Sequence, residues 1–176
     1  MSFAFTTPVR FSDVDHAGIV YYPRFFHFFH LAFEELWRAR IGPRAYSELI
    51  DRDKVGFPAV RAECEFKAPL RFGDSAEIEV TVGKLGAKSI TFRYRIFRSA
   101  EGETTPQVTE DHSLGSRSPL PPATQRALGD SPRLADRERT LCAEGTVICA
   151  VVDLARFVAM PVPERVVKML SDLVVP

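Results

Sequence analysis

A long helix with apolar side chains on almost every face is the feature that most limits how this chain can fold. Pro23 suits the first turn of a helix, where its missing N–H leaves no hydrogen bond unmade, and Gly42-Pro43 predicts the end of that helix. The apolar residues between these points are Phe25, Phe26, Phe28, Phe29, Leu31, Ala32, Phe33, Leu36 and Trp37. A helix that is apolar all round is normally buried, so we expect the rest of the chain to wrap around it.

Alternating apolar and polar residues on both sides of this helix predict β-strands. One strand is expected at residues 3–11, before the helix. A helical turn is expected at 44–52, and four further strands follow at the residue ranges 60–68, 75–85, 88–98 and 141–154. Gly86-Ala87 predicts a tight hairpin between the two middle strands. This order predicts an α+β fold in which a mainly antiparallel sheet wraps around the long central helix.

Residues 99–140 differ in composition from the rest of the chain. Prolines are frequent there, and most other residues are polar or charged. So few apolar residues cannot offset the entropy cost of ordering the segment. We therefore expect a single domain over residues 1–176 with a flexible insertion at about 99–140. The alternative is a segment that becomes ordered over a ligand or a partner.

The length and charge of the chain exclude several classes of protein. A chain of 176 residues suits one well-buried domain. Its 23 Lys and Arg balance 23 Asp and Glu, so no strong field draws it to nucleic acid or to an anionic membrane. No apolar run reaches the roughly 20 residues of a membrane-spanning helix, and residues 1–8 do not resemble a secretory signal. We expect a cytoplasmic protein without a nucleic-acid or membrane partner.

The cysteines and histidines do not predict a metal or redox site. Cys64, Cys142 and Cys149 form no CxxC pair, and free buried thiols are expected. His27 and His30 are three residues apart on the helix, but no further ligand follows at a matching interval, and zinc needs three or four protein ligands. We expect neither a metal nor an organic cofactor.

The run Asp13-Val14-Asp15-His16-Ala17-Gly18-Ile19-Val20-Tyr21-Tyr22-Pro23 leads from the first strand into the helix. The Asp15 carboxylate can attack a substrate or activate water. Unpaired amides at the start of the helix can hold an oxygen that becomes negative. Together these are the two halves of an acyl-transfer site. For Asp13 we prefer a structural role, such as a turn or cap hydrogen bond, because a second buried charge needs a partner.

This segment, residues 9–26, resembles the opening of the hotdog-fold acyl-CoA thioesterases of the 4-hydroxybenzoyl-CoA thioesterase group. The resemblance covers most of residues 3–98 and continues from 141 to about 165, including Pro161-Val162-Pro163. It implies that subunits join their sheets edge to edge and that the active sites lie at the subunit interface. It also implies an acyl-CoA substrate and a homodimer or homotetramer.

The resemblance assigns catalytic roles to two positions of the run. It makes Asp15 the nucleophile or the general base toward water, and it makes the Tyr22 backbone amide the group that polarises the thioester carbonyl. Gly18 would let the loop approach the thioester, and His16 is a candidate for proton transfer. We place Gly18 and His16 among the substrate-binding residues.

Further substrate contacts are expected outside the run. Phe57, in Gly56-Phe57-Pro58, matches the segment that borders the acyl pocket in relatives. Lys84 and Lys88 flank the hairpin whose basic residues hold the nucleotide phosphates in relatives. Arg61 and Lys67 are candidates to assist them.

The function that these residues predict is hydrolysis of an acyl-CoA to the free acid and CoA. The sequence does not decide between an aromatic acyl group, such as 4-hydroxybenzoyl, and a short-chain acyl group. One alternative is a hotdog hydratase or dehydratase that uses Asp15 and His16 as an acid–base pair. Another is a non-catalytic acyl-CoA sensor or assembly subunit.

Overall fold

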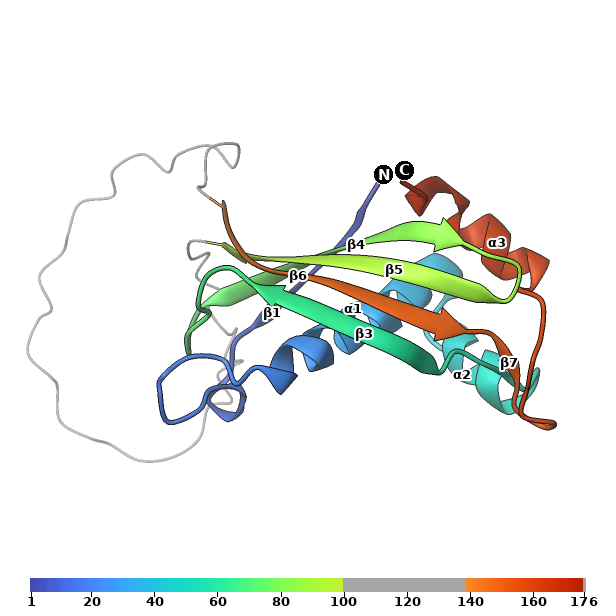
Figure 1. Ribbon diagram of the computed structural model, residues 1–176, viewed down its shortest axis with the longest axis horizontal. Helices are drawn as coiled ribbons and strands as arrows, with labels where there is room; N and C mark the ends of the chain where they lie inside the picture. Colours follow the sequence, from blue (N-terminus) through green and yellow to red (C-terminus); the bar gives the residue numbers. More distant parts are fainter. Residues whose placement is uncertain (100–138, 176) are drawn as a thin grey trace, which may run out of the picture.

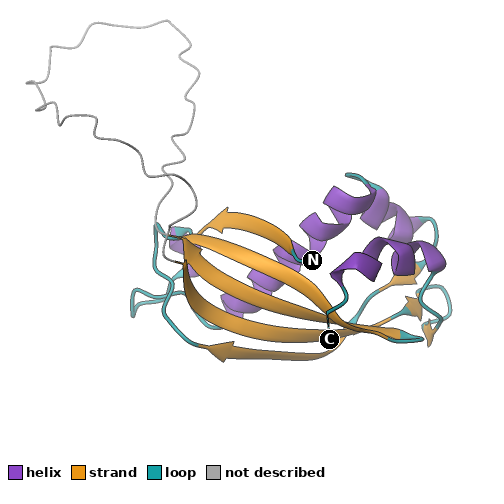
Figure 2. Cartoon of the chain, turned by 90° about the horizontal axis from the view of Figure 1, so that it is seen from above, coloured by secondary structure: helices purple, strands orange, loops and turns teal. Residues whose placement is uncertain are grey.

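A curved antiparallel sheet holds the long helix against its inner face (Figure 1 and Figure 2). The computed structural model describes residues 1–99 and 139–175. Its elements, in chain order, are β1 Phe3–Pro8, η1 Phe11–Asp13, α1 Pro23–Ile41, α2 Ala45–Asp51, β2 Val55–Gly56, β3 Ala59–Phe66, β4 Ser75–Leu85, β5 Ser89–Ser99, β6 Arg139–Ala150, β7 Val152–Asp153, β8 Val158–Ala159, α3 Glu164–Leu170 and η2 Ser171–Leu173. The predicted α+β class is confirmed.

The main sheet has the strand order β1-β4-β5-β6-β3, with every neighbouring pair antiparallel. β4 shows the alternation that its sequence predicts, with Ala76, Ile78, Val80 and Val82 buried on the inner face. β3 is an edge strand, and seven of its eight residues are exposed in the single chain. Its free edge therefore leaves unpaired backbone groups that can pair with another strand.

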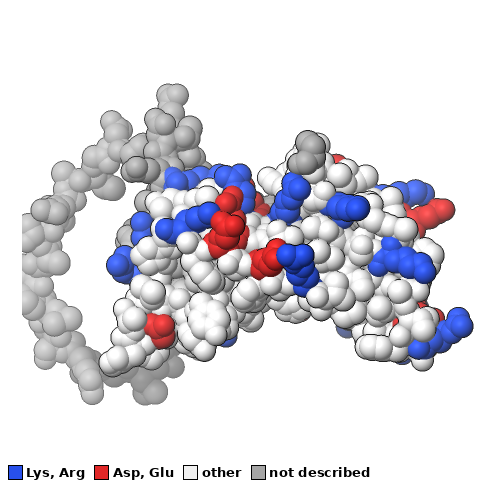
Figure 3. All heavy atoms as spheres, in the orientation of Figure 1, with Lys and Arg blue, Asp and Glu red and all other residues white. Residues whose placement is uncertain are grey.

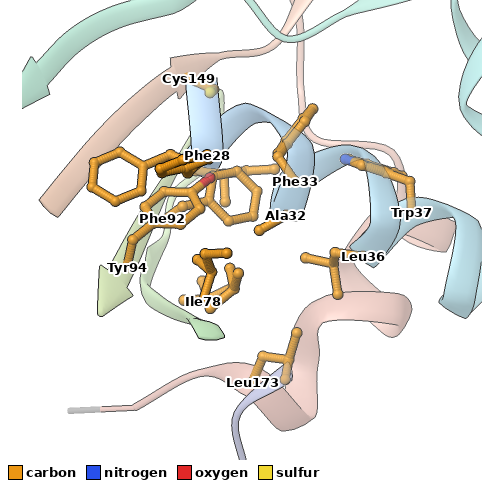
Figure 4. Close-up of a cluster of buried hydrophobic side chains, with 14 of the residues drawn as sticks. Phe28, Ala32, Phe33, Leu36, Trp37, Ile78, Phe92, Tyr94, Cys149 and Leu173 are labelled. Carbon is orange, nitrogen blue, oxygen red and sulfur yellow. The ribbon is translucent and has the colours of Figure 1, made fainter. Parts of the chain in front are cut away.

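α1 packs its largest side chains into the core. Its buried residues are Phe25, Phe28, Phe29, Ala32, Phe33, Leu36 and Trp37. Figure 4 shows how several of them meet Ile78, Phe92 and Tyr94 of the sheet and Leu173 near the carboxyl end. The helix begins at Pro23 and ends before Gly42, as its sequence predicts. It is not buried on every side, because His27 and His30 are exposed.

The first strand is shorter than predicted. β1 ends at Pro8, and residues 11–13 form the 3-10 turn η1. The Arg10 N–H donates to the Asp13 carboxylate at 2.8 Å, so a side chain takes a backbone donor that a longer strand would use in the ladder. Asp13 therefore does not lie on a strand with Asp15, and the two carboxylates do not share a strand face.

The carboxyl-terminal part contains elements that its sequence did not predict. The strand expected at 141–154 divides into β6 and β7, and β7 joins β2 and β8 in a small separate sheet. Two-residue strands are too short to show a period. α3 was also not expected. After α3 in the chain, the Val175 N–H donates to the Val82 carbonyl at 3.0 Å, and this hydrogen bond attaches the carboxyl end to β4.

The described strands reach both ends of the predicted insertion. β5 continues to Ser99, and β6 begins at Arg139, whose guanidinium lies 4.0 Å from the centre of the Phe97 ring. The predicted boundaries at 99 and 140 thus fall inside strands. The remainder, with the flexible segment that we expect, lies outside the described residues. Within the described part of the chain, no helix is both long and apolar enough to cross a membrane.

Candidate active site

The segment between η1 and α1 folds into a small hairpin that carries Asp15. Val14 and Val20 form a β-bridge, and the Asp15 N–H donates to the Ile19 carbonyl at 3.0 Å. The Gly18 N–H closes the turn on the Asp15 carbonyl at 3.0 Å, and Gly18 has a φ of +75°. A turn followed by a residue of positive φ is a common three-residue hairpin loop, and glycine adopts that conformation without steric cost.

Asp15 and Tyr22 line the same cavity beside this hairpin. The cavity measures about 650 Å³. Its lining consists of Asp15, Ile19, Val20, Tyr22, Phe25, Phe66, Lys67, Ala68, Pro69 and Leu70. The Asp15 side chain is exposed, and one of its oxygens accepts the Ala17 N–H at 2.8 Å. The other oxygen is left for a substrate or a water molecule, so the carboxylate is placed for acid–base or nucleophilic work.

The Tyr22 backbone amide stands out among the amides at the start of α1. The Tyr21 N–H donates to the Asp13 carbonyl at 2.9 Å, and the Arg24 N–H donates to the Tyr21 carbonyl at 2.8 Å. Pro23 has no N–H. No described residue accepts a hydrogen bond from the Tyr22 N–H. This amide is therefore a free donor at the positive end of the helix dipole, where a developing negative charge is stabilised.

The other predicted site residues are not all in this cavity. His16 is exposed on the turn and is not among the described residues that line it. Lys84 and Lys88 are exposed beside the β4–β5 turn, at the far end of the sheet from the loop before α1 (Figure 1). In a single chain, the structure does not bring these lysines to Asp15. Lys67, which lines the cavity, pairs with Glu65 at 2.5 Å.

Phe57 lies in a second cavity of about 310 Å³ between α1 and β3. The cavity is lined by Phe26, Phe29, His30, Phe33, Tyr46, Phe57, Ala59, Ala62, Tyr94, Val147 and Cys149. Phe57 is only 8% exposed, and its ring centre lies 4.8 Å from that of Trp37. Aromatic rings from several elements thus surround a space that suits an apolar or aromatic group.

The hydroxyls of Tyr46 and Tyr94 and the thiol of Cys149, which line the second cavity, are neutral at ordinary pH. Burial raises the pKa of Tyr46 to about 12 and that of Cys149 to about 11. Burial also raises the pKa of Tyr94. All three therefore keep their protons and can donate a hydrogen bond to an acceptor atom in the cavity. Sequence reasoning missed Tyr46 and Tyr94 because they lie far apart in the chain and meet only in the fold.

Trp37 adds an unpaired donor next to this cavity. Its indole N–H is buried and has no hydrogen-bond partner among the described residues. The ring centres of Phe33 and Tyr46, which line the cavity, lie 5.7 and 5.5 Å from that of Trp37. Figure 4 shows the nitrogen on the side of the ring that faces Phe33. An unpaired buried donor is rare, so an acceptor beside Trp37 would be stabilised.

A third cavity, of about 630 Å³, lies on the outer face of the sheet. The charged side chains that line it are Glu63, Glu65, Glu79, Arg93, Arg95 and Glu144. Four carboxylates against two guanidinium groups disfavour the phosphates of CoA. Figure 3 shows acidic and basic side chains next to one another over this face, where Arg95 pairs with Glu79 and Glu144. The Asp15 cavity is therefore the better candidate for the active site.

The cysteines and Asp13 agree with their sequence predictions in most respects. All three cysteines are free; Cys142 and Cys149 are buried, whereas Cys64 is only partly buried. Asp13 is buried and accepts hydrogen bonds from Arg10 and Arg24, which confirms a structural role. The described residues contain no cluster of side chains that could hold a metal ion.

Comparison with known proteins identifies the family. Residues 9–128 match the thioesterase-like superfamily. The 1,4-dihydroxy-2-naphthoyl-CoA hydrolase of Synechococcus elongatus is 32% identical over 126 residues, which cover 70% of this chain and 92% of that protein. The chain therefore belongs to the thioesterase-like superfamily.

Solved structures support the fold. A 1,4-dihydroxy-2-naphthoyl-CoA thioesterase from Synechocystis superposes over 100% of both chains with a TM-score of 0.69 and 19% identity. A 4-hydroxybenzoyl-CoA thioesterase, solved with 4-hydroxybenzoyl-CoA, superposes over 96% of this chain and 98% of that one, with a TM-score of 0.67 and 19% identity. The predicted hotdog fold is confirmed, and the prediction of a thioester hydrolase is confirmed at the level of the family.

Proposed function

We propose that this protein hydrolyses an acyl-CoA to the free acid and CoA, with Asp15 and the Tyr22 backbone amide as the catalytic groups. The observation that carries the proposal is that Asp15 and Tyr22 line one cavity, and that the Tyr22 N–H has no acceptor among the described residues. The amide would donate a hydrogen bond to the thioester oxygen and stabilise the negative charge that grows on it. Removal of one such donor typically costs about 3 to 4 kcal/mol of transition-state stabilisation.

Asp15 has two chemically complete routes to the products. As a nucleophile, it would attack the thioester carbon and expel the CoA thiolate, and water would then hydrolyse the mixed anhydride. As a general base, it would take a proton from water while the water oxygen attacks the same carbon. The tetrahedral intermediate would then break its C–S bond, and the departing CoA thiolate would take the proton from Asp15. Both routes consume one water and need the same amide donor, so either would depend on Tyr22 N–H.

We further propose that the working unit is a dimer joined through β3. The exposed edge of β3 supports this arrangement, because an antiparallel partner strand would satisfy its backbone groups. In such a pair, the start of one β3 lies beside the end of the other. Ala59 lines the second cavity and Phe66 lines the Asp15 cavity, so each Asp15 would lie near the second cavity of the partner subunit.

The same pairing accounts for two expected groups of substrate contacts. The second cavity, with Phe57, would hold the acyl group. The β4–β5 turn with Lys84 and Lys88 would lie at the same end of the joined sheet as the partner subunit's Asp15, where cations favour CoA phosphates. The ring-lined cavity and its neutral hydroxyl donors support an aromatic acyl group with an oxygen substituent. His16 and Gly18, on the hairpin turn, would border the thioester.

The test is CoA thiol release from a panel of thioesters: 4-hydroxybenzoyl-CoA, 1,4-dihydroxy-2-naphthoyl-CoA, benzoyl-CoA and butyryl-CoA. We expect hydroxylated aromatic thioesters to have the highest kcat/KM. Asp15→Asn should lower kcat at least 100-fold, within the range for loss of a general base. Asp51→Asn, which changes an exposed carboxylate at the end of α2, is the matched control and should not alter kcat.

Two results would contradict the proposal. Unchanged turnover in Asp15→Asn would remove the catalytic assignment. Thioesters that raise the melting temperature of the native protein without being cleaved would favour the sensor alternative instead.

The hydratase alternative needs His16 in the same cleft as Asp15, and hydration of an unsaturated acyl-CoA would identify it. Sedimentation of the native protein tests the dimer, and a β3 variant with Val60→Pro should sediment as a monomer.

A further inference from the structure

Asp13 is the only charged residue that is buried in the described part of the chain, and it lies beside the candidate site. It is 3% exposed. One carboxylate oxygen accepts the Arg10 N–H at 2.8 Å, and the other accepts Arg24 Nε at 2.8 Å and a second guanidinium N–H of Arg24. The carboxylate is therefore paired with a cation and held from two sides.

These contacts connect the two ends of the Asp15 hairpin. The Asp13 N–H donates to the Arg10 carbonyl at 2.9 Å, on the incoming side. The Asp13 carbonyl accepts the Tyr21 N–H at 2.9 Å, on the outgoing side, and its side chain holds Arg24 in the first turn of α1. Tyr22 lies between Tyr21 and Arg24. The free amide of Tyr22 is thus fastened on both sides to the residue two positions before Asp15.

Stability by itself does not account for this ion pair. A cation in the first turn of a helix opposes the helix dipole. The Asp13 carboxylate is buried, whereas the Arg24 side chain is 34% exposed. Taking the carboxylate out of water is costly, so the pair gains little net stability over apolar residues of similar size. The pair has instead a strong geometric effect, since the planar guanidinium makes two directed hydrogen bonds to one carboxylate.

We propose that Asp13 and Arg24 are positioning residues that hold the Tyr22 N–H at the right place relative to the Asp15 carboxylate. This inference rests on the proposed thioester hydrolysis, and it concerns how the two catalytic groups are held in a fixed position relative to each other. Neither Asp13 nor Arg24 lines the Asp15 cavity. Both act through Tyr22, so their loss should reduce the rate of the chemical step rather than substrate binding.

The first test is Arg24→Gln in the full chain, assayed with the best thioester of the panel. A displacement of about 1 Å at a reacting group can cost about 100-fold in rate. We expect kcat to fall at least tenfold while KM changes less than threefold. Arg38→Gln is the matched control, because Arg38 lies on the same helix and forms an exposed pair with Glu35 at 3.4 Å. It should leave kcat unchanged. Arg24→Lys keeps the positive charge but not the two directed guanidinium hydrogen bonds. Its kcat should lie between those of Arg24→Gln and the native protein.

A double variant separates positioning from folding stability. Arg24→Gln leaves the Asp13 carboxylate buried without its cation, so its melting temperature should fall. Asp13→Leu combined with Arg24→Met removes both charges and should raise the melting temperature back toward that of the native protein. Its kcat should stay at least tenfold low, because the side-chain hydrogen bonds between residues 13 and 24 are gone. A kcat that recovers together with the melting temperature would overturn the positioning role.

The outcomes also distinguish this inference from the proposed function. If the native protein cleaves no thioester in the panel, the proposed function fails and the positioning role fails with it. If the native protein is active and Arg24→Gln has the same kcat as Arg38→Gln, only the positioning role is overturned.

Discussion

The ring of Phe29 lies against the backbone of Gly145, in the space that a side chain at residue 145 would occupy. The ring also stacks on Tyr94, at 4.6 Å between centres, and Tyr94 is paired with Gly145 across β5 and β6. Glycine therefore lets α1 approach the sheet closely at this point, and the approach shapes one wall of the second cavity.

Gly145→Ala should destabilise the protein for this reason. The added methyl group would overlap the Phe29 ring, and overpacking of a core typically costs about 1–3 kcal/mol. Urea denaturation measures the loss. Gly83→Ala, in β4 of the same sheet, is the control: its methyl group would meet the flexible side chain of Arg93, which can move aside, so a smaller loss is expected. Equal losses in the two variants would contradict the close approach at Phe29.

Gly18 should be replaceable by asparagine but not by alanine. Its φ of +75° costs an ordinary residue about 1–2 kcal/mol, whereas asparagine adopts this region more readily. A methyl group at Gly18 meets no atom within 4 Å, so conformation rather than crowding decides the outcome in the single chain. We expect Gly18→Ala to lower both stability and kcat, and Gly18→Asn to retain most of each. Similar losses in both variants, measured by urea denaturation and thiol release, would point to a clash with substrate or partner.

Trp37 should report on the acyl group by fluorescence. It is the only tryptophan in the sequence, and its ring contacts residues that line the second cavity. The Asp15→Asn variant is expected to bind substrate with little turnover, so titration with 4-hydroxybenzoyl-CoA should shift the Trp37 emission maximum in a saturable way. CoA without an acyl group should cause no shift. If calorimetry detects binding of the thioester while Trp37 emission stays constant, the acyl group lies elsewhere.

Cys149 should be a poor nucleophile in the folded protein. Burial raises its pKa from 9.0 to about 11, so at pH 9 about 1% of this thiol is ionised, compared with about half in the unfolded chain. Alkylation by iodoacetamide at pH 9, located by mass spectrometry, should therefore be at least tenfold slower for native Cys149 than in urea. Equal alkylation rates in the two states would show that the thiol is not buried.

The same shift has a definite sign for stability. Because the folded pKa lies above the unfolded one, the contribution of the Cys149 thiol to the free energy of unfolding is fully present below pH 9 and is lost as the pH rises toward 11. Tyr46 behaves in the same direction between pH 10 and about 12. The urea midpoint should decline across this range, and the decline between pH 9 and 11 should be smaller in Cys149→Ala.

The local sequence pattern was sufficient to predict an element whose bounds depend only on its own residues. The range 75–85 matches β4 because alternation along a single strand marks its inner face. Pro23 and Gly42 mark the ends of α1 for equally local reasons. By contrast, the end of β1 depends on the hydrogen bond between Arg10 and Asp13, and β7 depends on its pairing with β2. Such pairings leave no periodic trace in the sequence.

The two parts of the candidate site differ in the same way. Asp15, Gly18 and Tyr22 lie within one short segment, and the chemistry of carboxylates, turns and helix ends, together with the resemblance to a known family, made them candidates before any coordinates. Only tertiary structure could pair Asp13 with Arg24, leave the Tyr22 amide without an acceptor, and bring Tyr46, Tyr94 and Cys149 to one cavity. Those relations depend on distances between elements, and such distances are set by the packing of the whole core around α1 rather than by any residue's immediate neighbours in the chain.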